Sequence, residues 1–348
     1  MIKLGIIGLQ RSGKSTVFRA LTGSRGDTET SYRKGTDQIG VVSVPDDRVG
    51  ILSGMYNPKK TTYAQVEYLL PAPNTTRGSS DKEAETWKLV KNCDALIHVV
   101  RNFQEPGGEP PKSRDDFQKL EEELIFTDLI IVEKRLERIE SEKKKGRKIN
   151  EEEHSLLKSS LEILEAEKPL RDVPEPASSP LLKGYTFLSA KPVLVLFNNS
   201  DEDDTSPDWV ATEGKPNTMV VRGELEMELA RMSSEDAAEF LAEFDINASA
   251  LDRVVQRSYE LLGLISFFTV GEDEVKAWTI KEGTVALDAA DVIHSDIKKG
   301  FIRAEVVAYD DLIKSGSYQE AKKQGLVRLE GKEYPVADGD IINFRFNV

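Results

Sequence analysis

Short apolar segments recur along much of the chain and are separated by helical or polar stretches. Runs of this length, rich in Val, Ile and Leu, are typical of strands buried on both faces of a parallel sheet. Alternation of such strands with helices favours a doubly wound α/β fold. The candidate strands are residues 3–8, 38–44, 64–70, 95–100, 191–198 and 218–221.

A long charged stretch interrupts this pattern between residues 116 and 170. Its apolar residues recur every three to five positions on either side of a break at Gly146-Arg147. This spacing predicts an antiparallel helical hairpin, a short coiled coil inserted in the sheet domain. We interpret the basic strip at the break as a solvated tip, with RNA contact as the alternative. The strip consists of Lys143, Lys144, Lys145, Arg147 and Lys148.

The last part of the chain alternates like short strands around a short helical stretch, 286–297, and follows a helix predicted over 248–262. About eighty residues of this kind are typical of a small α+β domain. The sequence therefore predicts four segments. They are 1–115 and 171–264 for the two parts of the sheet domain, 116–170 for the inserted hairpin and 265–348 for the terminal domain.

Composition narrows the class of protein. A chain of 348 residues can form two or three domains, and a formal charge of −14 argues against a broad basic surface for nucleic acid. The single cysteine, Cys93, excludes an intramolecular disulfide or a cysteine-rich zinc site and is expected in the core or at a strand edge. The start lacks a signal-peptide pattern and no apolar run reaches about 18 residues, so we expect a soluble, cytoplasmic monomer.

The stretch GIIGLQRSGKST, residues 5–16, carries the strongest chemical signal. Gly8, Gly13, Lys14 and Ser15 have the spacing G-x-x-x-x-G-K-S between a candidate strand and a candidate helix, the context of a phosphate-binding loop. Glycines let backbone N–H groups point at phosphate oxygens, and the helix start adds positive potential. In such a loop Lys14 would reach the β- and γ-phosphates, and Ser15 would ligate Mg²⁺.

A second sequence element is expected to bind the base of the nucleotide and to distinguish guanine from adenine. In common GTP-binding proteins N-K-x-D follows a buried strand, and its Asp accepts two hydrogen bonds from guanine. After the strand 191–198 this chain reads NNSDEDD; counted from Asn199, the fourth residue is Glu202, and no Lys follows the Asn. A Glu cannot keep the bidentate position of the shorter Asp, so this spacing argues against a strong guanine preference. The alternative is a merely acidic loop.

Together with the segments VKAWTI, IHSDIKKGFIRAEVVAYDDLI and LEGKEYPVADGDIINFRFNV, these elements resemble the YchF-type ATPases. These are Obg-related members of the translation-factor class of P-loop NTPases, and the resemblance spans nearly the whole chain. It implies a G domain, an inserted coiled coil and a C-terminal TGS domain with a β-grasp, ubiquitin-like fold. It also implies binding of ATP with Mg²⁺ in preference to GTP, and association with ribosomes.

Site residues follow from the resemblance by position. Asn199, Ser200 and Glu202 would surround adenine, and Glu226 falls where the family closes the base pocket. The residues that would contact the phosphates and Mg²⁺ are Arg11, Ser12, Gly13, Lys14, Ser15 and Thr16.

The segments that serve hydrolysis depart from the family pattern. Family members carry D-x-A-G before switch II, whereas this chain has Leu70 at the Asp position and Pro73 at the Gly position. Leu offers no oxygen to the metal and Pro no N–H to the γ-phosphate. Switch I leaves Thr36 as an uncertain Mg²⁺ ligand. Replacement of the lost carboxylate by Glu67 or Asp81 is the alternative.

The catalytic histidine of the relatives is also missing after the strand 95–100. We interpret His98, His154 and His294 as a strand residue, an exposed helix residue and a terminal-domain residue. Phosphoryl transfer depends on positioning and charge stabilisation, so these losses predict a nucleotide-binding protein with weak ATPase activity and no assignable catalytic residue. The alternatives are a non-enzymatic scaffold with a vestigial site and, less favoured, a GTPase.

Overall fold

The computed structural model describes residues 2–23, 36–72, 86–105, 107–215, 217–243 and 249–347. The chain divides into two compact units. The first comprises Met1–Val42 and Glu67–Leu251, and the second Ser43–Val66 and Asp252–Val348. None of the helices in the ranges given above has the length and apolar composition needed to span a bilayer.

The first unit is built on a six-stranded sheet in the order β2-β4-β1-β5-β6-β7. The pairs β1/β5, β5/β6 and β6/β7 are parallel, which confirms the expected α/β architecture. All six residues of β6 are buried, because helices cover both faces of a sheet of this kind. The strands are β1 (Ile2–Ile7), β2 (Gln38–Ser43), β4 (Gln65–Leu70), β5 (Ala95–Arg101), β6 (Val193–Asn198) and β7 (Thr218–Val221).

The helices of the first unit pack on this sheet or extend from it. Phe117, Leu120 and Leu124 join the sheet residues Val195 and Phe197 in one hydrophobic core. The helices are α1 (Lys14–Gly23), α4 (Ser113–Lys144), α5 (Glu151–Glu165), α6 (Pro174–Ser178), α7 (Asp208–Glu213), α8 (Gly223–Leu229) and α9 (Ser234–Glu243), with 3-10 turns at Leu170–Asp172 and Lys183–Tyr185.

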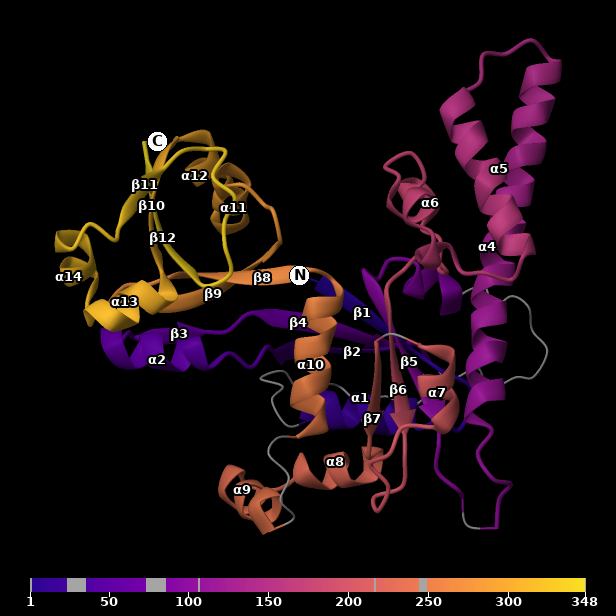
Figure 1. The fold of residues 1–348 in the computed structure, drawn as a ribbon, viewed down its shortest axis with the longest axis horizontal. Coiled ribbons are helices and arrows are strands. Elements are labelled where there is room, and N and C mark those ends of the chain that lie inside the picture. The colour runs from indigo at the N-terminus through magenta and orange to yellow at the C-terminus, as the bar shows by residue number, and fades with distance from the viewer. Residues whose placement is uncertain are drawn as a thin grey trace. The chain divides into compact units, whose positions relative to one another are not determined.

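The predicted hairpin corresponds to α4 and α5, which run antiparallel side by side (Figure 1). Val132, Leu136 and Leu157 belong to a separate core that the two helices share. The Asn150 side chain begins α5 by accepting hydrogen bonds from the backbone N–H groups of Glu152 and Glu153. The apolar spacing therefore predicted both helices, and the break lies at the turn between them.

The second unit contains a mixed sheet in the order β11-β10-β12-β8-β9-β3. β12 pairs in parallel with β8, while β8/β9 and β10/β12 are antiparallel. Ala286, Ala289 and Ala290 of α11 pack in the core against this sheet, as expected for a β-grasp fold. The elements are α2 (Asp47–Tyr56), β3 (Lys60–Thr62), α10 (Ala250–Leu261), β8 (Leu264–Thr269), β9 (Glu274–Lys281), α11 (Ala286–Ile293), α12 (Ser295–Lys299), β10 (Phe301–Ala308), α13 (Tyr309–Ser315), α14 (Tyr318–Lys323), β11 (Arg328–Glu330) and β12 (Asp340–Phe346).

Residues 43–66 lie in this second unit, although the sequence assigned them to the first domain. The reason is β3, which pairs in parallel with β9 through Lys60↔Glu274 and the two pairs that follow. Three residues of sequence KTT carry no apolar pattern, so the strand could not be predicted. Residues 252–264, which the sequence also assigned to the sheet domain, lie in the second unit as well, and the remaining boundaries stay a prediction.

Candidate nucleotide site

The loop between β1 and α1 requires glycine at two positions. A Cβ atom at Gly8 would lie 2.4 Å from the carbonyl oxygen of Val99, and one at Gly13 would lie 2.0 Å from Nδ2 of Asn198. Gly13 also has φ +88°, and Arg11 has φ +63°. Left-handed residues within a short loop turn successive N–H groups to one side, which creates a concavity suited to an anion.

Lys14, the first residue of α1, is folded back over this loop. Its Nζ donates a hydrogen bond of 2.9 Å to the carbonyl oxygen of Leu9, and burial lowers the pKa of its ammonium group. The backbone N–H groups of Thr16 and Val17 both donate to the carbonyl of Gly13, which closes the first turn of α1. The first N–H groups of a helix lack intrahelical acceptors, so those at the start of α1 remain for a ligand.

Ser12 and Arg11 differ in their surroundings. Ser12 is 2% exposed, and its Oγ has no hydrogen-bond partner among the residues that the structure describes. The Arg11 side chain is 78% exposed, and its Nη1 lies 3.2 Å from Oε2 of Glu105. Ser12 is thus enclosed within the loop, whereas Arg11 is held at the surface by an ion pair. Their predicted phosphate contacts stay a prediction.

Asn198, the last residue of β6, connects the loop to α8. Its Nδ2 donates to the carbonyl oxygen of Ser12 at 3.2 Å, and its Oδ1 accepts from the backbone N–H of Gly223 at 2.9 Å. A Cβ atom at Gly223 would lie 2.7 Å from Oδ1 of Asn198, so glycine is needed there for this contact. Sequence reasoning missed Asn198, although its place at the end of a buried strand was the available signal.

Asn199 makes different contacts. Its Oδ1 accepts from Nδ2 of Asn102 at 2.9 Å, and its Nδ2 donates to the carbonyl oxygen of Thr205 at 2.8 Å. This buried amide fastens two loops to each other, and its described hydrogen bonds do not include the glycine loop. The predicted place of Asn199 around a base stays a prediction.

The remaining predicted base contacts lie on the same loop or on α8. Ser200 and Glu202 are exposed, and their place around a base stays a prediction. Glu226 is 3% exposed, and its carboxylate accepts from the Ala250 N–H at 2.8 Å and from the Ser249 hydroxyl at 2.6 Å. Both oxygens of Glu226 thus bind the start of α10, and its expected part in closing a base pocket stays a prediction.

The positions predicted to hold Mg²⁺ carry hydroxyl or apolar side chains. Ser15 is exposed in the first turn of α1, and Thr36 precedes β2. Leu70 is 3% exposed at the end of β4, so that position carries an apolar side chain. The Asp37 carboxylate accepts from the Ala72 N–H at 2.8 Å and holds the chain that follows β4. The predicted positions Pro73 and Asp81 lie outside the described residues.

Glu67 does not replace the missing carboxylate. Its carboxylate lies 2.7 Å from Nζ of Lys3 in an ion pair. Lys3 is at the beginning of β1, five residues before Gly8. At a strand rise of about 3.3 Å per residue the ion pair is roughly 16 Å from the loop. This alternative is therefore wrong.

The three histidines are held by contacts outside the glycine loop. His98 of β5 is 1% exposed and stacks on Phe117, and burial, with a smaller contribution from the charge of Arg171, lowers its pKa to about 3. His154 is 9% exposed within α5, so the prediction of an exposed residue is wrong. His294 begins α12, where its Nδ1 accepts from the Asp296 N–H. Because the His98 side chain is enclosed in the core, it is not exposed to an attacking water.

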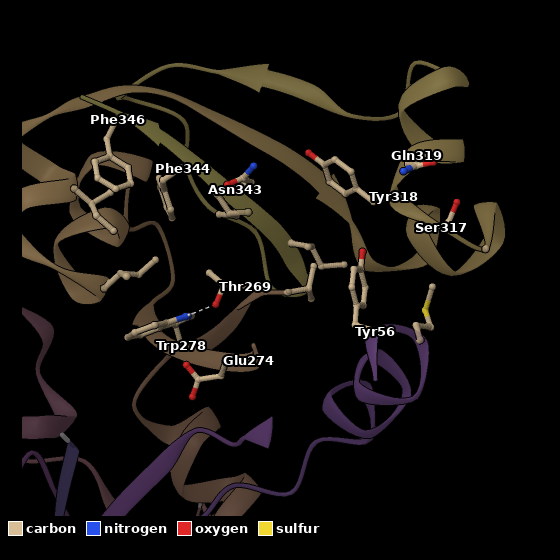
Figure 2. A pocket seen from close by; sticks show the side chains of 17 residues that line it. Tyr56, Thr269, Glu274, Trp278, Ser317, Tyr318, Gln319, Asn343, Phe344 and Phe346 are labelled. Carbon is tan, nitrogen blue, oxygen red and sulfur yellow. Dashed lines mark hydrogen bonds between the residues drawn. The ribbon is translucent and has the colours of Figure 1, made fainter. Parts of the chain in front are cut away.

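A hollow of about 760 Å³ lies in the second unit (Figure 2). Tyr56, Trp278 and Tyr318 line it, and Trp278 donates a hydrogen bond to Thr269. The one carboxylate in the lining, Glu274, is engaged by the hydroxyl of Thr62 at 2.6 Å. The hollow offers aromatic surface, but the lining residues include no group arranged for phosphate or metal.

The parallel sheet, the forced glycines and the lysine at the start of α1 together define a P-loop NTPase fold. The family model described as YchF-GTPase_C, a protein of unknown function (DUF933), matches residues 264–347. The ribosome-binding ATPase YchF of Bacillus subtilis is 39% identical over 99% of both chains, and that of Mycoplasma genitalium 35% over 100% of both. The structure of the Schizosaccharomyces pombe YchF GTPase has a TM-score of 0.85 and 27% identity, over 99% of this chain and 97% of that one. The chain belongs to the YchF family.

Proposed function

We propose that this protein binds a nucleoside triphosphate together with Mg²⁺ at residues 8–16. The observation that carries this proposal is Lys14, a partly buried cation whose described partner is only the carbonyl of Leu9. A phosphate would replace this neutral acceptor with an anion in a loop whose N–H groups already favour one. The forced glycines at positions 8 and 13 support the same use, because they let the backbone approach a ligand closely.

The residues present fit Mg²⁺ bound mainly through the nucleotide. Ser15 in the first turn of α1 would hold the ion beside the phosphates, with Thr36 as a further candidate ligand. Mg²⁺ in such sites keeps several waters and needs few protein ligands. When bound, the ion neutralises charge on the phosphate oxygens. The apolar Leu70 leaves its water shell without the usual carboxylate.

Hydrolysis by this site is weak. Leu70 supplies no charge, Glu67 is paired with Lys3 near the beginning of β1, and His98 is enclosed in the core. Positioning of water and stabilisation of charge supply most of the rate in phosphoryl transfer, so the loss of these parts lowers turnover without preventing binding. A non-enzymatic scaffold is the limiting case, in which turnover is zero.

The role of the protein is linked to the ribosome. Relatives that are 32–39% identical over nearly the whole chain are named ribosome-binding ATPases, which supports this partner. The basic strip at the tip of the hairpin, Lys143 to Lys148, supplies positive charge for a phosphate backbone despite the acidic composition of the chain. We expect a cytoplasmic monomer.

The names of the relatives disagree about which nucleotide, ATP or GTP, these proteins hydrolyse. The curated bacterial proteins are called ATPases, which supports the ATP preference expected from the family resemblance. The fission yeast structure is titled a GTPase. GTP is therefore the second candidate for this chain.

Turnover measurements test this proposal. Steady-state release of phosphate from ATP and GTP is measured with and without ribosomes, for this protein and for the Bacillus subtilis relative. We expect a rate at least roughly tenfold below that of the relative, equivalent to about 1.4 kcal/mol of lost transition-state stabilisation. A rate equal to that of the relative would contradict the reading of Leu70 and His98.

A further inference from the structure

We propose that the hollow in the second unit binds an extended, basic segment of another protein, which adds to the sheet as a strand beside the end of β12. Three features of this unit carry the proposal. They are an open backbone edge, a hollow lined from both faces of the sheet, and the charge of that lining. None of them involves the nucleotide proposed at residues 8–16.

The sheet of the second unit has an open edge along the end of β12. β10 pairs with β12 over its whole length, from Asp340 to Phe346, whereas β8 pairs with it only through Ile341↔Phe268. β8 ends at Thr269, one residue beyond that pair, while β12 continues to Phe346. At a strand rise of about 3.3 Å per residue, roughly 13 Å of β12 extend past the end of its neighbour.

The unpaired backbone groups at this edge belong to Phe344 and Phe346. The N–H of Asn347 donates to the carbonyl of Gly300 at 3.0 Å, so the backbone of Asn347 faces the β10 side. Successive residues of a strand face alternate neighbours, so Phe344 and Phe346 face the side on which β8 has ended. In the ranges that the structure describes, their N–H and C=O groups have no partner there. Such an edge is a template for an added strand.

The hollow lies at this edge and is lined from both faces of the sheet (Figure 2). Trp278 and Phe344 belong to the face that packs on α11. Asn343 and Tyr318 belong to the opposite face, where both side chains donate to Glu305. A hollow can reach both faces only where the sheet has a gap. Alternate side chains of an added strand would therefore point into its two sides.

The two sides of the hollow differ in chemistry. Ile293 and Ile297 extend the apolar side, whereas Ser317 and Gln319 extend the polar side. The Tyr56 hydroxyl, also on the polar side in Figure 2, is enclosed and lacks a hydrogen-bond partner among the described residues. A peptide carbonyl would supply the acceptor that this buried donor needs. We therefore expect a segment in which apolar and polar residues alternate.

The charge of the lining favours a basic segment. Glu274 is the one charged lining residue in the described ranges, and its described partners, the Thr62 hydroxyl and Nζ of Lys60, contact Oε1. The hydrogen bond from Thr62 lowers the pKa of Glu274, so its carboxylate is ionised at neutral pH. Lys60 is 70% exposed and screened by water, and the Lys276 ammonium lies 3.7 Å from the ring centre of Trp278. Oε2 of Glu274 is thus left for an Arg or Lys of the segment.

Synthetic peptides and the full chain test the added strand. The probe is a labelled hexapeptide in which threonine alternates with valine and one valine is replaced by arginine. We expect its fluorescence anisotropy to rise on binding, and amide exchange of Phe344 and Phe346, followed by NMR, to slow because the peptide covers their N–H groups. N-methylation of alternate peptide residues should weaken binding at least roughly tenfold for one of the two alternating sets only, since only one peptide edge meets β12.

Glu274→Gln tests the charge, with Glu272→Gln as the matched control. Glu272 is exposed between β8 and β9 and lies outside the lining. Glu274→Gln should weaken binding of the arginine peptide by about threefold or more and leave binding of the peptide without arginine unchanged. The new amide oxygen can still accept from Thr62, so the unfolding temperature should stay unchanged.

Each contrary result removes a stated part of the proposal. Equal losses from both sets of N-methyl groups, or unchanged amide exchange at Phe344 and Phe346, would overturn the added strand. Equal effects of Glu274→Gln and Glu272→Gln, or tighter binding of the matching glutamate peptide, would overturn the basic segment. Failure of every peptide to bind at up to about 1 mM would overturn the whole proposal, and binding of polyuridylate in their place would indicate a nucleic-acid ligand.

Discussion

Two consecutive asparagines at the end of β6 have separate partners. Asn198 joins the phosphate loop to α8, whereas Asn199 joins the loops that carry Asn102 and Thr205. At the scale of single residues, two neighbouring amides of the same type therefore have different structural roles. Both amides are buried, so each must satisfy its polar atoms with fixed partners.

Substitution of each asparagine separates the two roles. Asn198→Ala should weaken nucleotide binding by roughly tenfold or more and lower the unfolding free energy by about 1–3 kcal/mol, because it leaves the Gly223 N–H buried without an acceptor. Asn199→Ala should have a similar effect on stability but little selective effect on binding. Nucleotide titration and urea unfolding of both variants check this. Equal losses of affinity in the two variants would mean that Asn198 has no special link to the loop.

Sequence reasoning located the glycine loop and Lys14 because their spacing is a local property. It placed the end of β6 correctly at Asn198, but it could not tell which of the two asparagines bonds to the loop, because those partners are distant in the sequence. His154 was misjudged for a related reason. A polar residue in a charged helix is expected to be exposed. Whether it is buried depends on tertiary packing, which the local pattern does not show.

At the scale of elements, one buried carboxylate attaches the hairpin to the sheet domain. Asp128 of α4 is 0% exposed and accepts hydrogen bonds from the backbone N–H groups of Leu188 and Ser189, at 2.9 and 2.6 Å. Burial raises the pKa of Asp128 to about 6, even though these hydrogen bonds act in the opposite direction. The attachment is therefore both structural and sensitive to pH.

Asp128→Ala should destabilise the protein by about 2–4 kcal/mol at pH 5, because two buried N–H groups lose their acceptor. The raised pKa means that the contribution of Asp128 is fully present below the unfolded value near 4 and declines as pH rises through 6. The difference between the two proteins should thus shrink by pH 7.5. Urea unfolding at both pH values measures it, with Glu133→Ala on the exposed face of α4 as control. A difference that grew with pH would contradict this account.

The helices of the hairpin were predictable because their apolar spacing is regular over many turns. The attachment by Asp128 was not, since it depends on Leu188 and Ser189, about sixty residues further along the chain. β3 escaped prediction for the same physical reason. Its three polar residues become a strand only by pairing with β9.

At the scale of the whole molecule, the family assignment suggests an ATPase, whereas the altered switch positions suggest weak hydrolysis. The relatives share nearly the full length of this chain and are named as ATPases. We propose that the phosphate loop binds a triphosphate and that hydrolysis is weak, because Leu70 is apolar and His98 is enclosed in the core. On this proposal, nucleotide binding would change the state of the protein only if its two conformations differ in affinity for the nucleotide.

The most direct test of this account is the affinity of the full chain for GTP and ATP, measured by titration with and without Mg²⁺ and repeated with Lys14→Ala. We predict binding that strengthens with Mg²⁺ and falls by roughly a hundredfold in the variant, since a charged hydrogen bond contributes about 1.5–3 kcal/mol. Arg19→Ala, an exposed substitution on the same helix, is the control and should bind normally. Absence of binding, or equal affinity in the unmodified chain and Lys14→Ala, would show that the loop does not hold a nucleotide.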